Sequence, residues 1–137
     1  MTKQDIRSRS DLETLVHSFY AKVRKHADLG PFFNNMIDDW SLHMKRFTEF
    51  WYSNLFVTKT YKGKTLNKHV AVDNHFDYEI KKLHFNIWLE LWEQSVDALY
   101  YGEKAYQAKR RARCMAQILC QKLFAARKEE RNQIRVA

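Results

Sequence analysis

Residues that interrupt helices are scarce in this sequence of 137 residues, which contains one proline and three glycines. Proline removes a backbone donor and clashes with the preceding turn, and glycine weakens a helix through its conformational freedom. Long stretches without either residue therefore favour long helices. The length fits one domain, and we expect a single domain over residues 1–137, with a poorly ordered polar N-terminus at residues 1–10.

Apolar residues recur at steps of three and four along four segments, which is the spacing of one face of a helix. Ser10-Asp-Leu-Glu13 reads as a capping box for the first segment, and Asp38 or Asp39 can cap the second. The third and fourth segments are separated by Gly102. The expected helices run from the capping box to before Leu29-Gly-Pro31, from Asp38 or Asp39 to about Leu55, from about Asp77 to Tyr101, and from about Glu103 to Arg131. We expect Phe32 and Phe33 in a tight connection, and the sequence predicts an all-α domain.

No apolar run approaches the length of a membrane span, and the polar N-terminus lacks a signal-peptide pattern. We therefore expect a cytoplasmic protein without a membrane partner. Cys114 and Cys120 are six residues apart on one predicted helix, so their side chains point to different faces and we expect reduced thiols. A C-x-x-C-H haem attachment sequence is absent, so any haem would be held noncovalently.

The positive charge of the chain is concentrated at its C-terminal end. Residues 103–137 carry 10 Lys and Arg against 3 Asp and Glu, whereas residues 1–102 carry 14 against 13. A basic helix with the run Lys109-Arg-Arg111 and Arg113 can bind the phosphates of a nucleic acid through charge alone. Such a face is more often simply solvated, so we do not expect nucleic acid as a partner and keep nucleic-acid binding as a remote alternative.

A short stretch from Tyr61 to Val70 places Leu66 and His69 three residues apart, on the same side of a helical turn. Aromatic-rich segments flank it on both sides. A flat apolar macrocycle needs aromatic walls, one imidazole below its iron and cations near its propionates. A lone histidine is more often a surface or capping residue, but this setting makes His69 a candidate haem ligand. The candidate cations at the rim are Lys45, Arg46 and Lys68.

Several motifs, taken in order, resemble the truncated haemoglobins of group III. The resemblance covers about residues 15–100 without large gaps, and the motifs are specific as a set rather than singly. They are Phe19-Tyr20-Ala-Lys-Val-Arg24, Leu29-Gly-Pro31 with Phe33-Asn-Asn35, Trp40-x-x-His43, Phe50-Trp51, Tyr61-x-Gly63, Leu66-x-x-His69 and Phe85-x-x-Trp88-Leu.

The resemblance implies a two-over-two helical sandwich around haem b, iron protoporphyrin IX. It makes His69 the proximal ligand and puts Tyr20, His43 and Trp88 on the distal side. Each of these three would otherwise be read as structural. The predicted cofactor contacts are Phe33 and Phe47 against the porphyrin, Leu66, Met115 from the last helix, and the cations Lys45, Arg46 and Lys68. The chain departs from the family pattern at Thr65 and at Val72-Asp-Asn-His75, which predicts a looser proximal loop.

A phenol and an indole N–H aimed at a bound diatomic ligand would stabilise the charge that builds up on it. We therefore expect tight, slowly released O2, with NO, CO and peroxide as further ligands. Tight binding suits redox chemistry, either NO dioxygenation or peroxide reduction, better than O2 delivery, and it requires a reductase that returns the iron to the ferrous state. The alternative is a haem carrier or electron-transfer protein in which His43 is a second iron ligand.

Overall fold

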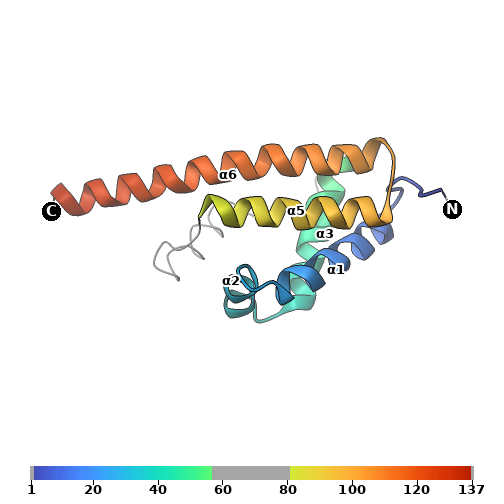
Figure 1. Ribbon diagram of the computed structural model, residues 1–137, viewed down its shortest axis with the longest axis horizontal. Helices are drawn as coiled ribbons and strands as arrows, with labels where there is room; N and C mark the ends of the chain where they lie inside the picture. The colour runs from blue at the N-terminus through green and yellow to red at the C-terminus, as the bar shows by residue number, and fades with distance from the viewer. Residues whose placement is uncertain (1, 57–80, 137) are drawn as a thin grey trace.

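The computed structural model describes residues 2–56 and 81–136, with side-chain surroundings given up to Glu129. The described ranges contain five helices and no strand, which agrees with the all-α prediction. The helices, labelled as in Figure 1, are α1 (Arg9–Lys25), α2 (Gly30–Met36), α3 (Trp40–Phe56), α5 (Lys82–Leu99) and α6 (Glu103–Val136).

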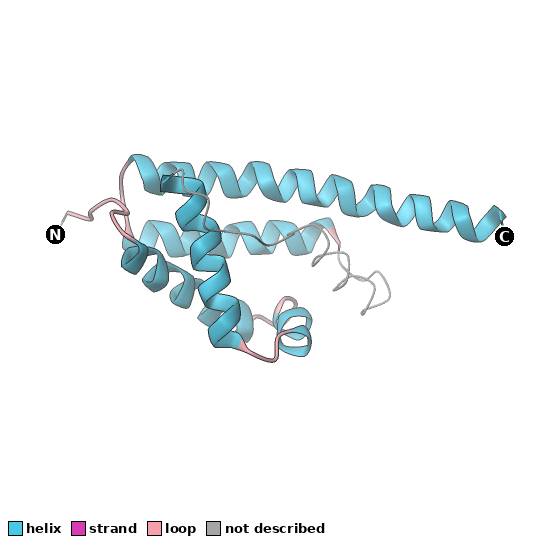
Figure 2. Ribbon diagram, turned by 180° about the vertical axis from the view of Figure 1, so that it is seen from behind, coloured by secondary structure: helices cyan, strands magenta, loops and turns pink. Residues whose placement is uncertain are grey.

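The helices form two layers. α5 and α6 run side by side as one pair, and α1 and α3 form the other, with α2 at one end (Figures 1 and 2). Two contacts join the layers: α1 packs against α5, and α3 reaches α6. Within its own layer α1 also contacts α2 and α3. The C-terminal part of α6 extends past the start of α5. No helix in the described ranges is long and apolar enough to cross a membrane.

Helix α1 buries the apolar stripe that the sequence predicted, but it starts earlier than expected. Ser8 is its N-cap, because the Asp11 backbone N–H donates to the Ser8 hydroxyl at 3.3 Å. The predicted capping box at Ser10 is therefore wrong, and Ser10 lies within the first turn. The buried residues are Leu12, Leu15, Val16, Phe19, Tyr20 and Val23.

The short helix α2 replaces the tight connection that we expected at Phe32 and Phe33. Pro31 occupies its first turn, where a missing backbone N–H costs nothing. Gly30 packs closely on the end of α1, since a Cβ at this position would lie 2.8 Å from the Arg24 carbonyl oxygen. This contact sets the sharp turn that carries Phe33 back toward α1.

The ends of α3, α5 and α6 agree only in part with the boundaries predicted from the sequence. Asp39 caps α3, because its side chain accepts the Leu42 backbone N–H at 3.1 Å, as predicted. Lys81, expected inside the third long helix, is instead the N-cap of α5. Gly102 separates α5 from α6 as predicted, with a φ of +152° that disfavours other residues. α6 continues beyond the predicted end at Arg131.

Two polar contacts fix α6 to the rest of the molecule, and we call them the α6 anchors. The Asp5 carboxylate accepts the backbone N–H groups of Lys104 and Ala105, at 2.9 and 2.8 Å. The Arg111 guanidinium donates to the carbonyl and side-chain oxygens of Asn54, at 2.5 and 2.9 Å. The first anchor caps the N-terminus of α6, and the second ties its middle to α3.

Two tryptophans fill the centre between the helix pairs. Trp51 of α3 and Trp92 of α5 are both fully buried and stack at 4.8 Å with an interplanar angle of 18°. The Trp92 indole N–H donates to the Ala108 carbonyl at 3.1 Å. The Trp51 indole N–H has no hydrogen-bond partner among the described residues. Buried donors are nearly always paired, so Trp51 is an exception with an energetic cost.

Candidate functional site

A hydrogen bond between Tyr20 and His43 is the central feature of the candidate site. The Tyr20 hydroxyl and His43 Nε2 are 2.8 Å apart. Tyr20 is buried on α1 and His43 is half-buried on α3, so the packing of these two helices brings the groups together. Which atom donates depends on the imidazole. A neutral ring with its proton on Nδ1 accepts the phenol proton at Nε2, whereas a ring that carries a proton on Nε2, neutral or charged, donates to the phenol oxygen.

Aromatic rings surround this polar pair on several sides. We call Phe19, Tyr20, Phe33, Trp40, His43, Phe47 and Trp88 the aromatic cluster. Ring centroids lie 5.3 Å from Tyr20 at Phe47 and 6.1 Å at Phe33, both close to edge-to-face. Phe47 also stacks on His43 at 6.4 Å with an interplanar angle of 7°. Few polar groups share the space, so a hydrogen bond there acts in a low dielectric.

Trp88 joins the cluster from α5. Its ring lies edge-to-face against Phe19 at 5.6 Å and against Phe47 at 6.4 Å. Both phenylalanines also contact Tyr20. The three residues predicted for the distal side, Tyr20, His43 and Trp88, therefore come from three different helices and belong to one cluster.

The other predicted contacts divide into three groups. Phe33 and Phe47 lie in the cluster, and Met115 is half-buried against the main core. Lys45 and Arg46 are exposed on α3. Lys45 is two residues from both His43 and Phe47, which puts it on the opposite side of the helix. The residues predicted in the proximal segment, Leu66, Lys68 and His69, lie outside the described residues.

Trp40 and Arg24 were not given a role from the sequence. The Trp40 ring lies 5.4 Å from Tyr20 and 5.8 Å from His43. The Arg24 guanidinium lies over the Trp40 ring, 4.4 Å from the ring centroid. The spacing Trp40-x-x-His43 was the available signal, because residues three apart share a helix face. Trp40 closes the side of the cluster nearest the end of α1.

The basic run of α6, the basis of the nucleic-acid alternative, is largely used within the molecule. Arg111 binds Asn54, Arg113 pairs with Glu93 at 2.5 Å, and Lys109 pairs with Asp97 at 2.6 Å. Of the four cations, only Arg110 has no such contact in the described part of the chain. The ion pairs of Lys109 and Arg113 are exposed and contribute little to stability. The run thus partly serves to connect α6 to α3 and α5.

The residues of the aromatic cluster fit a haem group. Phe33, Phe47 and Trp88 pack on the core yet remain half-buried, so each keeps apolar ring surface available. A phenol, an imidazole and an indole lie among them, and these are the donors that a ligand on a haem iron would need. The described residues would thus line one face of a haem, and an imidazole ligand for its iron would come from outside them.

Comparison with known proteins identifies the class. The chain is 34% identical over 113 residues to the group 3 truncated hemoglobin ctb of Campylobacter jejuni subsp. jejuni, an alignment that covers 80% of this chain and 85% of the relative. The crystal structure of group III truncated hemoglobin from Campylobacter jejuni matches with a TM-score of 0.79 and 31% identity, covering 89% of this chain and 95% of that chain. A scan against protein-family models finds no match.

The fold is therefore the truncated globin fold, with the two crossed helix pairs described above. More particularly, the chain belongs to the group III truncated haemoglobins. Haem is the cofactor expected for this family, and membership implies that a diatomic ligand binds at the haem. The family and fold expected from the sequence motifs are confirmed.

Proposed function

We propose that this haem protein carries out redox chemistry on a tightly held diatomic ligand or on peroxide, rather than delivering O2. The observation that carries the proposal is the 2.8 Å hydrogen bond between Tyr20 and His43 within the aromatic cluster. Haem supplies an iron that binds such ligands and exchanges single electrons. The side chains around it decide how firmly the ligand is held and where protons go.

In this proposal His69 is the proximal ligand, and Tyr20, His43 and Trp88 face the bound ligand from the distal side. The Tyr20 hydroxyl and the Trp88 indole N–H would donate to the ligand atom that gains negative charge. Hydrogen bonds to charged groups contribute roughly 1.5–3 kcal/mol each. Phe33 and Phe47 exclude water, which strengthens those bonds. Tight retention favours reaction with a second molecule over release.

His43 controls the direction of the Tyr20 hydroxyl. When the imidazole is neutral and accepts the phenol proton, that proton is not available to a ligand. When the imidazole is protonated it donates to the phenol oxygen, and the Tyr20 proton is free to point into the pocket. The hydrogen bond therefore provides a route by which a proton can pass between the imidazole and the phenol.

This proton path supports peroxide reduction as well as NO dioxygenation. Cleaving the O–O bond of peroxide requires a proton on the departing oxygen, and a phenol hydrogen-bonded to an imidazole is suited to supply one. NO dioxygenation instead requires that O2 be retained until NO arrives, which depends on the donors of Tyr20 and Trp88. Both reactions consume electrons, which a reductase partner would supply.

The remaining predicted contacts belong to the same proposal. Leu66 and Met115 would touch the porphyrin, and the cations Lys45, Arg46 and Lys68 would lie near its propionates. The side of α3 on which Lys45 lies makes Arg46 the better candidate of the two on that helix. The hydrogen bond to Tyr20 supports His43 as a partner of the phenol, which disfavours the alternative of a second histidine ligand to iron.

Rapid mixing tests the proposed redox chemistry. Haem-loaded ferrous protein equilibrated with O2 is mixed with NO, and nitrate is measured; ferric protein is mixed with peroxide, and peroxide loss is measured. We expect nitrate in proportion to protein, or steady peroxide loss with a reductant, and a marked slowing in Tyr20→Phe. Tyr52→Phe, a tyrosine on α3 beneath Arg9, is the matched control and should behave as the parent. No nitrate and no peroxide loss would contradict the proposal.

A further inference from the structure

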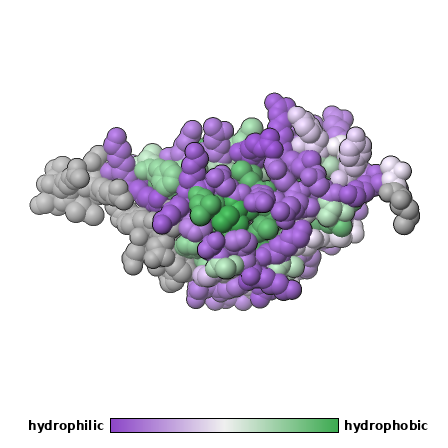
Figure 3. All heavy atoms as spheres, viewed as in Figure 1, coloured by the Kyte–Doolittle hydropathy of each residue, from purple (hydrophilic) through white to green (hydrophobic). Residues whose placement is uncertain are grey.

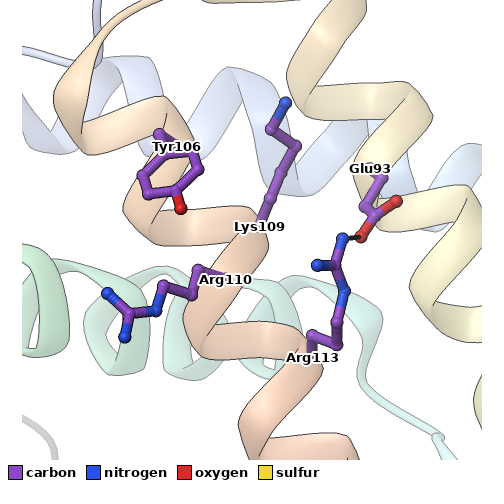
Figure 4. Close-up of a pocket in the computed structure, with 5 residues that line it drawn as sticks. All are labelled: Glu93, Tyr106, Lys109, Arg110 and Arg113. Atoms are coloured by element: carbon purple, nitrogen blue, oxygen red, sulfur yellow. Dashed lines mark hydrogen bonds and ion pairs between the residues drawn. The ribbon is translucent and has the colours of Figure 1, made fainter.

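A cleft between α5 and α6 is lined by residues that do not belong to the aromatic cluster. Its volume is about 260 Å³, and it is lined by Glu93, Tyr106, Lys109, Arg110 and Arg113 (Figure 4). Three of the five are cations, while Tyr106 has 60% of its surface exposed. Figure 3 shows that the face bearing α5 and α6 is largely hydrophilic, with apolar atoms gathered near its middle. None of the cleft residues takes part in the site described above.

The cleft is linked to the aromatic cluster by two indoles. Trp88, in the cluster, stacks on Trp92 with centroids 6.3 Å apart and an interplanar angle of 8°. Trp92 donates its indole N–H to the Ala108 carbonyl at 3.1 Å, which joins it to the backbone of α6. Ala108 is two residues after Tyr106 and one before Lys109. The rings of Trp88 and Trp92 and this hydrogen bond thus reach from the cluster to the backbone of α6, two residues from the exposed Tyr106.

We propose that Trp88 and Trp92 carry electrons between the haem pocket and the α5–α6 cleft, with Tyr106 as the surface end of the path. The inference rests on the proposed function, because Trp88 is placed at the haem only there. An electron can pass in short steps between neighbouring side chains that are easily oxidised, and indole and phenol are the side chains that give up an electron most readily. Phenylalanine does not, so a Trp→Phe change interrupts the path.

The cations of the cleft indicate the kind of donor that would use it. Arg110 has no ion-pair partner in the described part of the chain, and the pairs of Lys109 and Arg113 are exposed. Exposed pairs contribute little and can exchange partners. A small anionic one-electron reductant, such as ascorbate, would be attracted to this surface and would meet Tyr106 there. One electron would pass from the donor to the iron for each reduction.

Peroxide makes the path visible through a covalent product. Hydrogen peroxide takes up two electrons and two protons and leaves as two waters. Two Tyr106 side chains, on two molecules, each give one electron through Trp92 and Trp88 and one phenolic proton to solvent. The two phenoxyl rings join by a carbon–carbon bond, and the ring hydrogens then return to the oxygens. One peroxide and two tyrosines yield one dityrosine and two waters.

The experiment treats haem-loaded protein with peroxide, without reductant, and measures dityrosine fluorescence and covalent dimer. We expect dimer in the parent and its loss in Tyr106→Phe, an exposed change that should leave the fold intact. Tyr101→Phe is the matched control, because Tyr101 is 75% exposed and would be the better target of diffusing oxidants. Trp92→Phe should also lose the dimer. Dimer that depends on Tyr101, or that survives Trp92→Phe, would overturn the path.

If peroxide leaves the haem absorption unchanged, the peroxide part of the proposed function fails, and a photochemical measurement decides the path. A ruthenium polypyridine complex is attached to the exposed Cys114, next to Arg113, in Cys120→Ser protein. After a light flash and external quenching, the oxidised complex draws one electron from ferrous haem. We expect Trp92→Phe to slow this step by an order of magnitude or more and Tyr101→Phe, an exposed change outside the cluster, to leave it unchanged. Equal rates in the parent and Trp92→Phe would overturn the proposal.

Discussion

The aromatic cluster and the α6 anchors use polar groups in opposite ways. In the cluster, a phenol and an imidazole share one hydrogen bond inside a largely apolar space. In the anchors, Asp5 and Arg111 form hydrogen bonds with backbone or side-chain partners, and these bonds hold α6 in place. The sequence suggests the reverse, because a basic run resembles a binding site and lone tyrosines and histidines resemble core residues. How deeply a polar side chain is buried, and which groups it bonds to, distinguishes a site residue from a structural anchor better than its residue type does.

The largest expected effect that separates the two regions is the loss of haem on removal of the proposed proximal ligand. His69→Ala should abolish stable haem retention, because the aromatic cluster supplies walls and distal donors but no proximal bond. Bound haem per protein after gel filtration measures this. His17→Ala, on the exposed side of α1, is the control and should retain haem fully. Full retention in His69→Ala would remove the proximal assignment.

A change in the second anchor should affect stability rather than haem. Arg111→Met keeps much of the aliphatic stem but removes the charged hydrogen bonds to Asn54, which should lower the free energy of unfolding by about 1.5–3 kcal/mol. Arg110→Met, a neighbouring exposed cation, should stay within about 0.5 kcal/mol of the parent. Urea unfolding of the haem-loaded proteins measures both. Equal effects of the two substitutions would show that the anchor carries no stability.

The two central tryptophans offer a paired test of a satisfied and an unsatisfied donor. Trp92→Phe removes the hydrogen bond to Ala108, whereas Trp51→Phe removes a buried N–H that has no partner in the described residues. Both changes leave a similar gap in the core. We therefore expect Trp92→Phe to lower the free energy of unfolding by about 0.5–1.5 kcal/mol more than Trp51→Phe. The reverse order would indicate that the Trp51 donor has a partner that the described contacts omit.

A further effect on stability, from the first anchor, depends on pH. Burial raises the pKa of Asp5, but the backbone N–H groups of Lys104, Ala105 and Ile6 outweigh it, so the pKa lies below its ordinary value of 3.8. The native state then binds fewer protons at this group than the unfolded state, and the stabilisation is complete above 3.8 and lost as pH falls through the lowered pKa. Asp5→Ala should cost about 0.5–2 kcal/mol at pH 7, as for other N-caps.

Unfolding of the parent and Asp5→Ala at neutral and strongly acidic pH measures this pH dependence. The gap in unfolding free energy between the two proteins should narrow as the carboxylate of the parent is protonated. A gap that stays constant down to the lowest pH at which both proteins fold would show that the charge of Asp5 does not contribute. Such a result would mean that Asp5 acts mainly by keeping the N-terminal segment packed, with Ile6 buried.

The helices and their buried faces could be predicted because each depends on local periodicity. The stripe of α1 and the caps at Asp39 and Gly102 follow from a few adjacent residues. The start of α1 was misplaced because Ser8 and Ser10 are both good caps, and only the observed hydrogen bond distinguishes them. The anchors could not be foreseen, since Asp5 and Arg111 find partners 100 and 57 residues away along the chain.

The candidate site was predictable only as a pattern of several motifs. Nothing in the spacing of Tyr20 and His43, which are 23 residues apart, requires that they meet. The family resemblance grouped both with Trp88 on the distal side, but the hydrogen bond between them was not predicted. The direct stack of Trp88 on Trp92 was not anticipated, because both were read as members of one apolar stripe.

The release rate of O2 from the ferrous protein tests most directly whether the cluster works as proposed. Stopped-flow displacement of O2 by CO should give slow release in the parent, and Tyr20→Phe should speed it by about 10–100-fold, the equivalent of one charged hydrogen bond. Tyr52→Phe should leave the rate unchanged. Fast release in the parent, or equal rates in the parent and Tyr20→Phe, would contradict the account.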